Sequence, residues 1–301
     1  LHYAHFLIHK VEMIFAVSLC LLAVGSLAEM PLPFTRELEL ETPQMSGNDV
    51  IIYQNLIIRD SAVATIESTG SFDTATETAT KEFQSAHDIK VTGVMDDETA
   101  SLLLSLHSAD GVKDTGFTAA SMGYLYKVFL PVYTNRSIES SATLYDAYNN
   151  ILMTFPARAH GHIDETYTGD YGDVGLNQFT TNGNTVTGLV EIDLNSPEPD
   201  PALYGPWPVN RIVRGLEGNS QFMLPYIRDG QLIHTGNWTD QGWGPTKPMP
   251  NSAGCVHSHP EHIERIYKTL ERLGVTINDN TFSGKEYPYK PQGIGVIELV
   301  E

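Results

Sequence analysis

Cysteine, basic residues and long apolar runs are all scarce in this chain. It contains two cysteines, Cys20 and Cys255, and 18 basic against 37 acidic residues, for a formal net charge of −19. With so few cysteines it cannot be a disulfide-rich scaffold. The acidic excess disfavours nucleic acid and anionic membranes as partners, and no segment approaches the roughly 18 to 20 apolar residues of a membrane-spanning helix. We therefore expect no nucleic-acid partner and no membrane span.

A shorter apolar segment lies near the start of the chain. Residues 14–24 are apolar at all but two positions, Lys10 lies upstream, and small residues follow at 26–28. This order is typical of a cleaved secretory signal. The sequence thus predicts a signal peptide over residues 1–28, with Met13 as a candidate start, and a secreted product, extracellular or periplasmic. After cleavage one unpaired cysteine is left in an oxidising compartment.

The rest of the chain is long enough for two domains, and its composition changes along its length. Residues 49–104 alternate helical apolar patterns with turn signals, whereas the chain from Tyr124 onward is rich in Tyr, Val, Thr, Gly and Pro and alternates as strands do. A polar, glycine-containing stretch separates them. We expect a small helical domain over 42–107, a linker over 108–121 and a mostly β domain over 122–301, with no longer-period repeat.

Three short helices are expected in the first unit. Apolar residues recur at helical spacing around Val50 and Phe83, residues 74–77 have the pattern of a capping box, and Asp96 or Asp97 can cap a third helix. The order of residues resembles the peptidoglycan-binding-like three-helix domain at Asp49-Val50, Tyr53-Gln54, Leu56, Gly70-Ser71-Phe72, Thr76, Ala79, Phe83-Gln84, Ile89, Gly93-Val94, Asp97, Thr99 and Leu102. That resemblance implies peptidoglycan glycan or stem peptide as a partner.

The second unit has the patterns of a β domain with one prominent helix. Strand alternation occurs at 124–133, 190–194 and 293–300. A helical apolar face at 260–273 begins with proline and ends before a glycine. We expect a β-sandwich-like domain with one clear helix directly after Cys255.

The surroundings of Cys255 indicate nucleophilic catalysis. The residue lies in a glycine-containing loop before a helix, where free backbone N–H groups and the helix dipole favour an anion. An unperturbed thiol is only about 3% ionised at pH 7, so it needs a base, and His234 is available upstream. The carbonyl of Thr235 can orient that imidazole. Backbone N–H groups around Gly254 and Cys255 can meet the negative charge that develops on a substrate oxygen.

Two motifs near Cys255 and His234 resemble the signature of a known family. His234-Thr235-Gly236, followed after a loop by Ser252-x-Gly254-Cys255, resembles the signature of the L,D-transpeptidase (YkuD-like) catalytic domain. The turn at 184–188 resembles the one that precedes a strand in such domains, and the resemblance covers residues 122–301. It implies Cys255 as nucleophile, His234 as general base and the Thr235 carbonyl as orienting group. Ser252 and Gly254 belong to the same motif.

The resemblance also implies a reaction. The thiolate attacks the carbonyl of the third residue of a peptidoglycan stem peptide, expels the terminal D-amino acid and holds the rest as a thioester. An amine of a neighbouring stem then resolves it, or water does, which makes the site an L,D-carboxypeptidase. The sequence leaves both acceptors open, and no cofactor is implied.

Two departures from the family pattern bear on substrate binding. The family usually has histidine where Ala253 stands, and arginine or asparagine where His257 stands. The hydrogen bonding of the loop and the charge that meets a substrate carboxylate are therefore expected to differ. We take His257 and Arg214 as the substrate-binding candidates, with Arg211 and Arg228 as other partners for a carboxylate.

Two other functions remain open. Cys255, His257, His259 and His262 lie close together in sequence and contain zinc-ligand types, which suggests a zinc-dependent hydrolase. Their spacing matches no familiar zinc motif and His-Glu-x-x-His is absent, so we expect no metal. A catalytically decayed, secreted peptidoglycan-binding protein is the non-enzyme alternative.

The biological purpose depends on the host. In a bacterium the implied role is cross-linking or trimming of its own wall, and in a eukaryote the target is foreign peptidoglycan. Asn135 and Asn237 begin glycosylation sequons, which matter only in a host that glycosylates secreted proteins.

Overall fold

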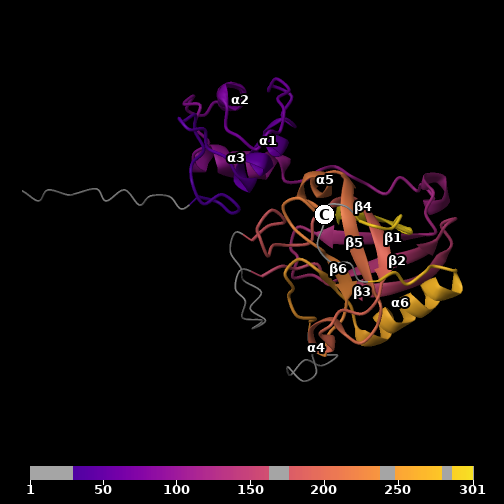
Figure 1. The fold of residues 1–301 in the computed structure, drawn as a ribbon. Coiled ribbons are helices and arrows are strands. Elements are labelled where there is room, and N and C mark those ends of the chain that lie inside the picture. Colours follow the sequence, from indigo (N-terminus) through magenta and orange to yellow (C-terminus); the bar gives the residue numbers. More distant parts are fainter. Residues whose placement is uncertain (1–29, 163–175, 238–247, 280–286, 301) are drawn as a thin grey trace, which may run out of the picture.

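The computed structural model describes residues 30–162, 176–237, 248–279 and 287–300. A helical part, indigo to purple in Figure 1, precedes a strand-rich part drawn from magenta to yellow. This confirms the expected succession of a helical and a mostly β unit. The predicted signal peptide lies outside the described residues. Within the described ranges, no helix is long and apolar enough to cross a membrane.

The helical part contains α1 (Asn48–Ile57), α2 (Thr74–Ala86) and α3 (Asp97–His107), as predicted. The expected capping box over 74–77 is wrong, because the side chain of Asp73 caps α2 by accepting from the N–H of Thr76 at 2.8 Å. Asp96 does the same for α3. A carboxylate at each N-cap satisfies a helix N–H that would otherwise lack a partner.

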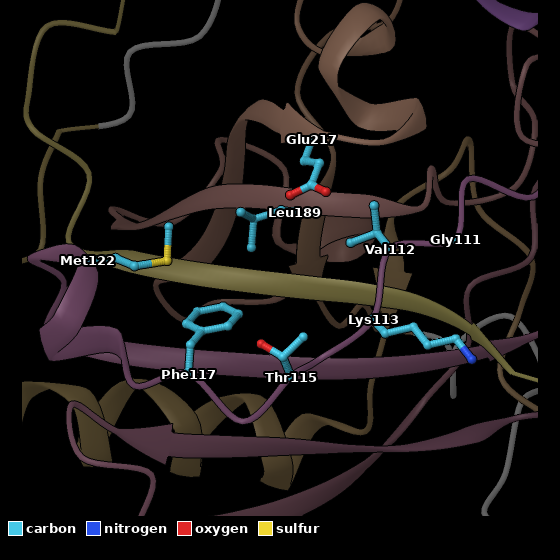
Figure 2. Close-up of a pocket in the computed structure, with 8 residues that line it drawn as sticks. All are labelled: Gly111, Val112, Lys113, Thr115, Phe117, Met122, Leu189 and Glu217. Atoms are coloured by element: carbon cyan, nitrogen blue, oxygen red, sulfur yellow. The ribbon is translucent and has the colours of Figure 1, made fainter. Parts of the chain in front are cut away.

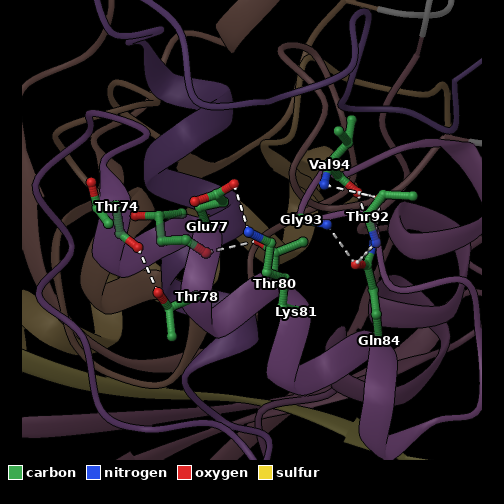
Figure 3. Close-up of polar contacts among 10 residues, drawn as sticks. Thr74, Glu77, Thr78, Thr80, Lys81, Gln84, Thr92, Gly93 and Val94 are labelled. Carbon is green, nitrogen blue, oxygen red and sulfur yellow. Dashed lines mark hydrogen bonds and ion pairs between the residues drawn. The ribbon is translucent and has the colours of Figure 1, made fainter.

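Two buried glutamines reveal an internal repeat that the sequence analysis missed. Gln84 on α2 accepts from the N–H groups of Thr92 and Gly93, both at 2.9 Å, and donates to the carbonyl of Val94 at 2.8 Å (Figure 3). Gln54 on α1 bonds the loop before α2 in the same way, since it accepts from the N–H of Gly70 at 2.9 Å. Each glutamine follows an aromatic residue on a helix and fixes the glycine turn that leads into the next helix.

The described strands form one eight-stranded sheet of order β3-β2-β1-β8-β4-β5-β6-β7. The strands are β1 (Tyr126–Tyr133), β2 (Ser140–Asp146), β3 (Ile151–Ala157), β4 (Gly188–Asn195), β5 (Val209–Glu217), β6 (Leu232–His234), β7 (Val256–His257) and β8 (Gly293–Val300). Arg158, which directly follows β3, exchanges backbone hydrogen bonds of 3.0 and 2.9 Å with His257 in β7. The two ends of the sheet, at β3 and β7, therefore meet, and the sheet is barrel-like.

This closure refines the expected architecture. The mostly β character is confirmed, whereas the described strands do not separate into the two facing sheets of a sandwich. The expected helix after Cys255 is α6 (Pro260–Arg272), which has proline in its first turn. Its Ile263, Ile266 and Leu270 are buried in the main apolar core, and α6 runs along the outside of the sheet in Figure 1. Two short helices, α4 (Pro201–Tyr204) and α5 (Asn219–Met223), lie in the β-domain connections.

The segment between the two parts is bound to the barrel along its length. Asp114 pairs with the Nζ of the buried Lys127 at 3.0 Å and its N–H donates to Glu298 at 2.9 Å. The Nδ2 of Asn149 donates to the carbonyl of Gly116 at 2.8 Å. The stretch expected to be a linker is therefore a strap on the sheet.

A groove of about 480 Å³ lies beside this strap (Figure 2). It is lined by Gly111, Val112, Lys113, Thr115, Phe117, Met122, Leu189 and Glu217. None of the residues singled out from the sequence as a site candidate lines it. The candidate site therefore lies elsewhere on the barrel.

Candidate functional site

Strands β6 and β7 place the predicted base beside the loop that carries the predicted nucleophile. His234 lies opposite His257 in the parallel β6–β7 pair, and the N–H of Leu232 donates to Sγ of Cys255 at 3.4 Å. Leu232 lies opposite Arg211 on β5. Residues that face each other across a ladder, or lie two apart along a strand, share a face. These five side chains therefore form one neighbourhood.

The loop before β7 is fixed by its own hydrogen bonds. The Oγ of Ser252 accepts from the N–H of Gly254 at 3.0 Å and donates to the carbonyl of Cys255 at 2.7 Å. The Oγ1 of Thr185 donates to the carbonyl of Gly254 at 3.0 Å. Since the N–H of Gly254 is engaged within the loop, the N–H of Cys255 is the better donor toward a substrate oxygen.

Arg228 holds this loop from behind. Its Nη2 donates to the carbonyl of Ala253 at 2.9 Å and to that of Gly183 at 3.0 Å, and its Nη1 donates to Gln178 and Asn184 at 3.0 and 2.8 Å. The guanidinium is buried, and burial lowers its pKa to about 10. It therefore remains charged at neutral pH. Among the described residues no carboxylate forms a salt bridge with it.

The sequence-predicted orientation of the base is present. Nδ1 of His234 lies 2.7 Å from the carbonyl oxygen of Thr235, so Nδ1 carries the proton and donates it. Nε2 is left as the proton acceptor. The loop that contains α4 covers the imidazole, because the ring of Tyr204 lies 5.1 Å from it and the N–H of Asn237 donates to the carbonyl of Ala202 at 2.8 Å.

Burial controls the charge of the predicted nucleophile and of the predicted base. It lowers the pKa of His234 to about 4. It also raises the pKa of Cys255, against the opposing effects of the Leu232 N–H, Arg228 and Arg211. At neutral pH the site therefore holds a thiol and a neutral imidazole. Such a pair transfers its proton during attack instead of resting as an ion pair.

His257 lies beside the base. Its ring is edge-on to that of His234 at 4.7 Å, and its Nδ1 lies 2.8 Å from the carbonyl oxygen of Pro250. Burial lowers its pKa well below the ordinary value, with His234 adding to the effect. His257 therefore presents a neutral ring at the site, where the family pattern has arginine or asparagine.

The zinc alternative also involves His259 and His262. His259 and His262 form an edge-on pair 5.9 Å apart at the start of α6. In the ranges that the structure describes, no group of three or more His, Cys, Asp or Glu residues is arranged to hold a metal ion.

The arginines considered from the sequence have different positions. Arg211 faces the site, donates from Nε to Asn195 at 3.0 Å and pairs through Nη2 with Glu198. Arg214 pairs with Glu191, and its side chain is 57% exposed. No contact among the described residues joins Arg214 to Cys255, so the substrate-binding role of Arg214 stays a prediction.

Several residues that support the Cys255 loop and His234 carry no signal in the sequence. Tyr204 and Glu198 were not singled out, because both lie in a Pro-rich connection that carries no motif. Gln178 was also missed, because its role depends on the burial of polar residues around 178–187, which exists only in the folded chain.

Comparison with known families places these observations in a class. Residues 140–281 match the family model of the L,D-transpeptidase catalytic domain, and residues 46–103 match that of the peptidoglycan binding domain. The chain therefore contains an L,D-transpeptidase (YkuD) catalytic domain preceded by a peptidoglycan-binding domain, which confirms both resemblances drawn from the motifs. The family models support a peptidoglycan-modifying transpeptidase at the level of the family. Comparison with curated protein sequences returns no match.

Three solved structures resemble the chain weakly. An L,D-transpeptidase from Xylanimonas cellulosilytica DSM 15894 is 12% identical with a TM-score of 0.27, over 84% of this chain and 94% of that one. One from Stackebrandtia nassauensis is 12% identical with a TM-score of 0.27, over 81% and 94%. A fused Zn-dependent amidase/peptidase/peptidoglycan-binding domain-containing protein from Clostridium acetobutylicum ATCC 824 is 14% identical with a TM-score of 0.24, over 87% and 99%. At scores this low the overlays carry no structural argument, and the assignment rests on the family models.

Proposed function

We propose that the protein is a secreted, cysteine-dependent acyl transferase that acts on peptidoglycan stem peptides, with Cys255 as nucleophile and His234 as general base. The observations that carry the proposal are the hydrogen bond from the N–H of Leu232, two residues before His234, to Sγ of Cys255 and the bond of Nδ1 of His234 to the Thr235 carbonyl. That bond leaves Nε2 as the acceptor for the thiol proton. The family models supply the substrate class.

The first half of the reaction forms a thioester. Sγ of Cys255 bonds to the carbonyl carbon of the third stem residue while its proton passes to Nε2 of His234. The N–H of Cys255 donates to the resulting oxyanion. The carbon–nitrogen bond to the terminal D-amino acid then breaks, and the imidazolium returns its proton to the departing amine. The acyl group is left on sulfur.

The second half resolves the thioester. An amine of a neighbouring stem attacks the same carbon, His234 accepts its proton, and the proton passes to the departing sulfur. With water as the acceptor the product is a free carboxylate, so the same residues give L,D-carboxypeptidase activity. The thioester and the choice of acceptor belong to this proposal.

The helical domain supplies proximity to the substrate in this scheme. A domain of the peptidoglycan-binding family holds the chain at the wall, which raises the effective concentration of stems near Cys255. Secretion, whether extracellular or periplasmic, fits such a cell-wall setting.

The decisive test is covalent chemistry at one sulfur. Purified protein is incubated with a tetrapeptide stem or a carbapenem and its intact mass is measured, with the modified peptide then mapped. We expect an acyl adduct on Cys255 that Cys255→Ala abolishes, with unfolding temperatures compared to establish that the variant is folded. Adding an amine acceptor separates transfer from hydrolysis by product mass. Binding to sacculi without any adduct identifies the protein as a decayed, peptidoglycan-binding relative.

A further inference from the structure

Two side-chain amides of the catalytic domain end on the last turn of the helical domain. Nε2 of Gln178 and Nδ2 of Asn219 donate to the carbonyl of Ser108, at 3.0 and 2.8 Å. Ser108 is the C-cap of α3, whose terminal carbonyls have no partner within the helix. Nearby, Nδ2 of Asn177 donates to the carbonyl of Leu32 at 2.6 Å. The end of α3 and the segment that precedes α1 are thus both bonded to residues 177–178.

The same segment leads directly to the nucleophile. The carbonyl of Gln178 accepts from Nη1 of Arg228, and Nη2 of that guanidinium donates to the carbonyl of Ala253, two residues before Cys255. Oε1 of Gln178 accepts from the N–H of Thr187 at 2.8 Å, which fixes the side chain that reaches Ser108. One residue therefore contacts the helical domain with its side chain and Arg228 with its backbone.

We propose that Gln178 and Arg228 are positioning residues through which the seating of the helical domain sets the reactivity of Cys255. The proposal rests on the proposed function, because it assigns a role to residues that support that nucleophile. In this role both residues act by holding the loop that carries Cys255, without contacting substrate.

The charge of Arg228 makes this path effective. A buried guanidinium held only by carbonyl oxygens has lost its water, and its hydrogen bonds to those oxygens are charge-assisted and stiff. In the described part of the chain no carboxylate pairs with it, so its positive field is not cancelled. A shift of the segment at 178–184 therefore moves both the backbone of the loop that carries Cys255 and the positive charge of Arg228 that lies against this loop.

Coupling of this kind acts in both directions. If a glycan bound to the helical domain changes how Ser108 sits on the barrel, the ionisation constant of Cys255 changes, and ionisation of Cys255 alters glycan affinity by the same factor. Binding to the wall and reaction with the wall are then linked through one chain of hydrogen bonds.

The test measures Cys255 directly and needs no substrate. The second-order rate of alkylation by iodoacetamide is measured from pH 6 to 9.5, with the Cys255 peptide mapped by mass, for the full chain and for Gln178→Ala and Arg228→Lys. The control is Asp114→Asn, which breaks the Lys127 pair of the strap without touching the segment at 178–184. Unfolding temperatures of all variants are recorded alongside.

For Gln178→Ala we expect a three- to tenfold slower reaction at pH 7, which corresponds to a rise in the thiol pKa of roughly half to one unit. Arg228→Lys keeps the positive charge but loses the planar set of guanidinium donors, and it shifts the profile in the same direction. Asp114→Asn lowers the unfolding temperature and leaves the profile unchanged.

Two outcomes overturn the proposal. One is an unchanged alkylation profile in Gln178→Ala, and the other is a decrease in Asp114→Asn equal to that in Gln178→Ala, which reveals only a general loss of stability. Failure of the proposed function looks different, because then no acyl adduct forms on Cys255 whatever the alkylation rates are.

Discussion

Gly254 and Arg228 are packed so closely that a Cβ atom on the glycine would overlap Nη2 of the guanidinium. Gly254 also has φ +99, a backbone conformation that L side chains rarely adopt. Glycine at this position therefore serves two needs, since it permits the turn and admits the cation that holds the loop.

Gly254→Ala is the first prediction. The new methyl group must displace Arg228 or the loop, so we expect a loss of roughly 2 to 4 kcal/mol in the free energy of unfolding together with loss of Cys255 acylation. Gly274→Ala is the matched control, because Gly274 has φ +84 but no atom within 4 Å of an added Cβ. It should cost only about 1 kcal/mol and leave acylation intact. Equal effects of the two substitutions in urea unfolding would contradict the packing argument.

The second prediction concerns stability at acid pH. Burial lowers the pKa of His234 in the folded chain from 6.5 to about 4. The unfolded chain therefore takes up a proton first, and stability that is complete above pH 6.5 is lost as the pH falls toward 4. This group alone can contribute up to about 3 kcal/mol to that loss. We expect His234→Gln to lose less stability than the parent between pH 7 and pH 4.5 in urea titrations; parallel losses rule out His234 as the cause.

The third prediction concerns how the thiol titrates. Because burial raises the pKa of Cys255 above its ordinary value, the thiolate population, followed by its ultraviolet absorbance, should climb about tenfold per pH unit from pH 6 to pH 8.5. His234→Ala should lower the alkylation rate near neutral pH by removing the proton acceptor. A thiolate population that has already levelled off at pH 7 would falsify the neutral thiol–imidazole pair and indicate a resting ion pair. Unchanged rates in His234→Ala would remove the base assignment.

The fourth prediction concerns the glutamine repeat in the helical domain. Gln84→Ala leaves the N–H groups of Thr92 and Gly93 without their acceptor in a buried turn, so we expect a loss of about 2 to 4 kcal/mol. Lys81→Ala removes the exposed pair with Glu77 and should cost no more than about 0.5 kcal/mol. Thermal unfolding followed by circular dichroism compares the two. A cost for Gln84→Ala as small as that for Lys81→Ala would show that the turn does not depend on the glutamine.

Much of the fold follows from local patterns. The helix at α6 was predicted to within a residue, because a proline start, an apolar face and a following glycine are all local signals. The final strand, β8, was predicted as it occurs, and β4 was found in part. The cap of α2 was assigned to the wrong residues, since Asp73 and Thr74 are both acceptable caps and only the backbone geometry at Asp73 decides between them.

The sheet itself could not be predicted in this way. Its order places β8 between β1 and β4, and its closure depends on two hydrogen bonds between Arg158 and His257. Such pairings join residues far apart in sequence and leave no periodic trace in either strand. The repeat of Gln54 and Gln84 was missed for a related reason, because the helix and loop lengths between its matching positions differ.

Sequence alone determined the two families to which the motifs and the helical unit belong, and it predicted the reactive groups: Cys255 in a Ser-x-Gly-Cys loop and His234 before Thr-Gly. These signals are short, contiguous and chemically specific, so they can be recognised without a structure. The tertiary structure decided which arginine faces the thiol, that the base is buried and neutral, and that Arg228 joins the loop to the segment beneath the helical domain. Burial and long-range hydrogen bonds set those properties, and both arise only when distant parts of the chain are brought into contact.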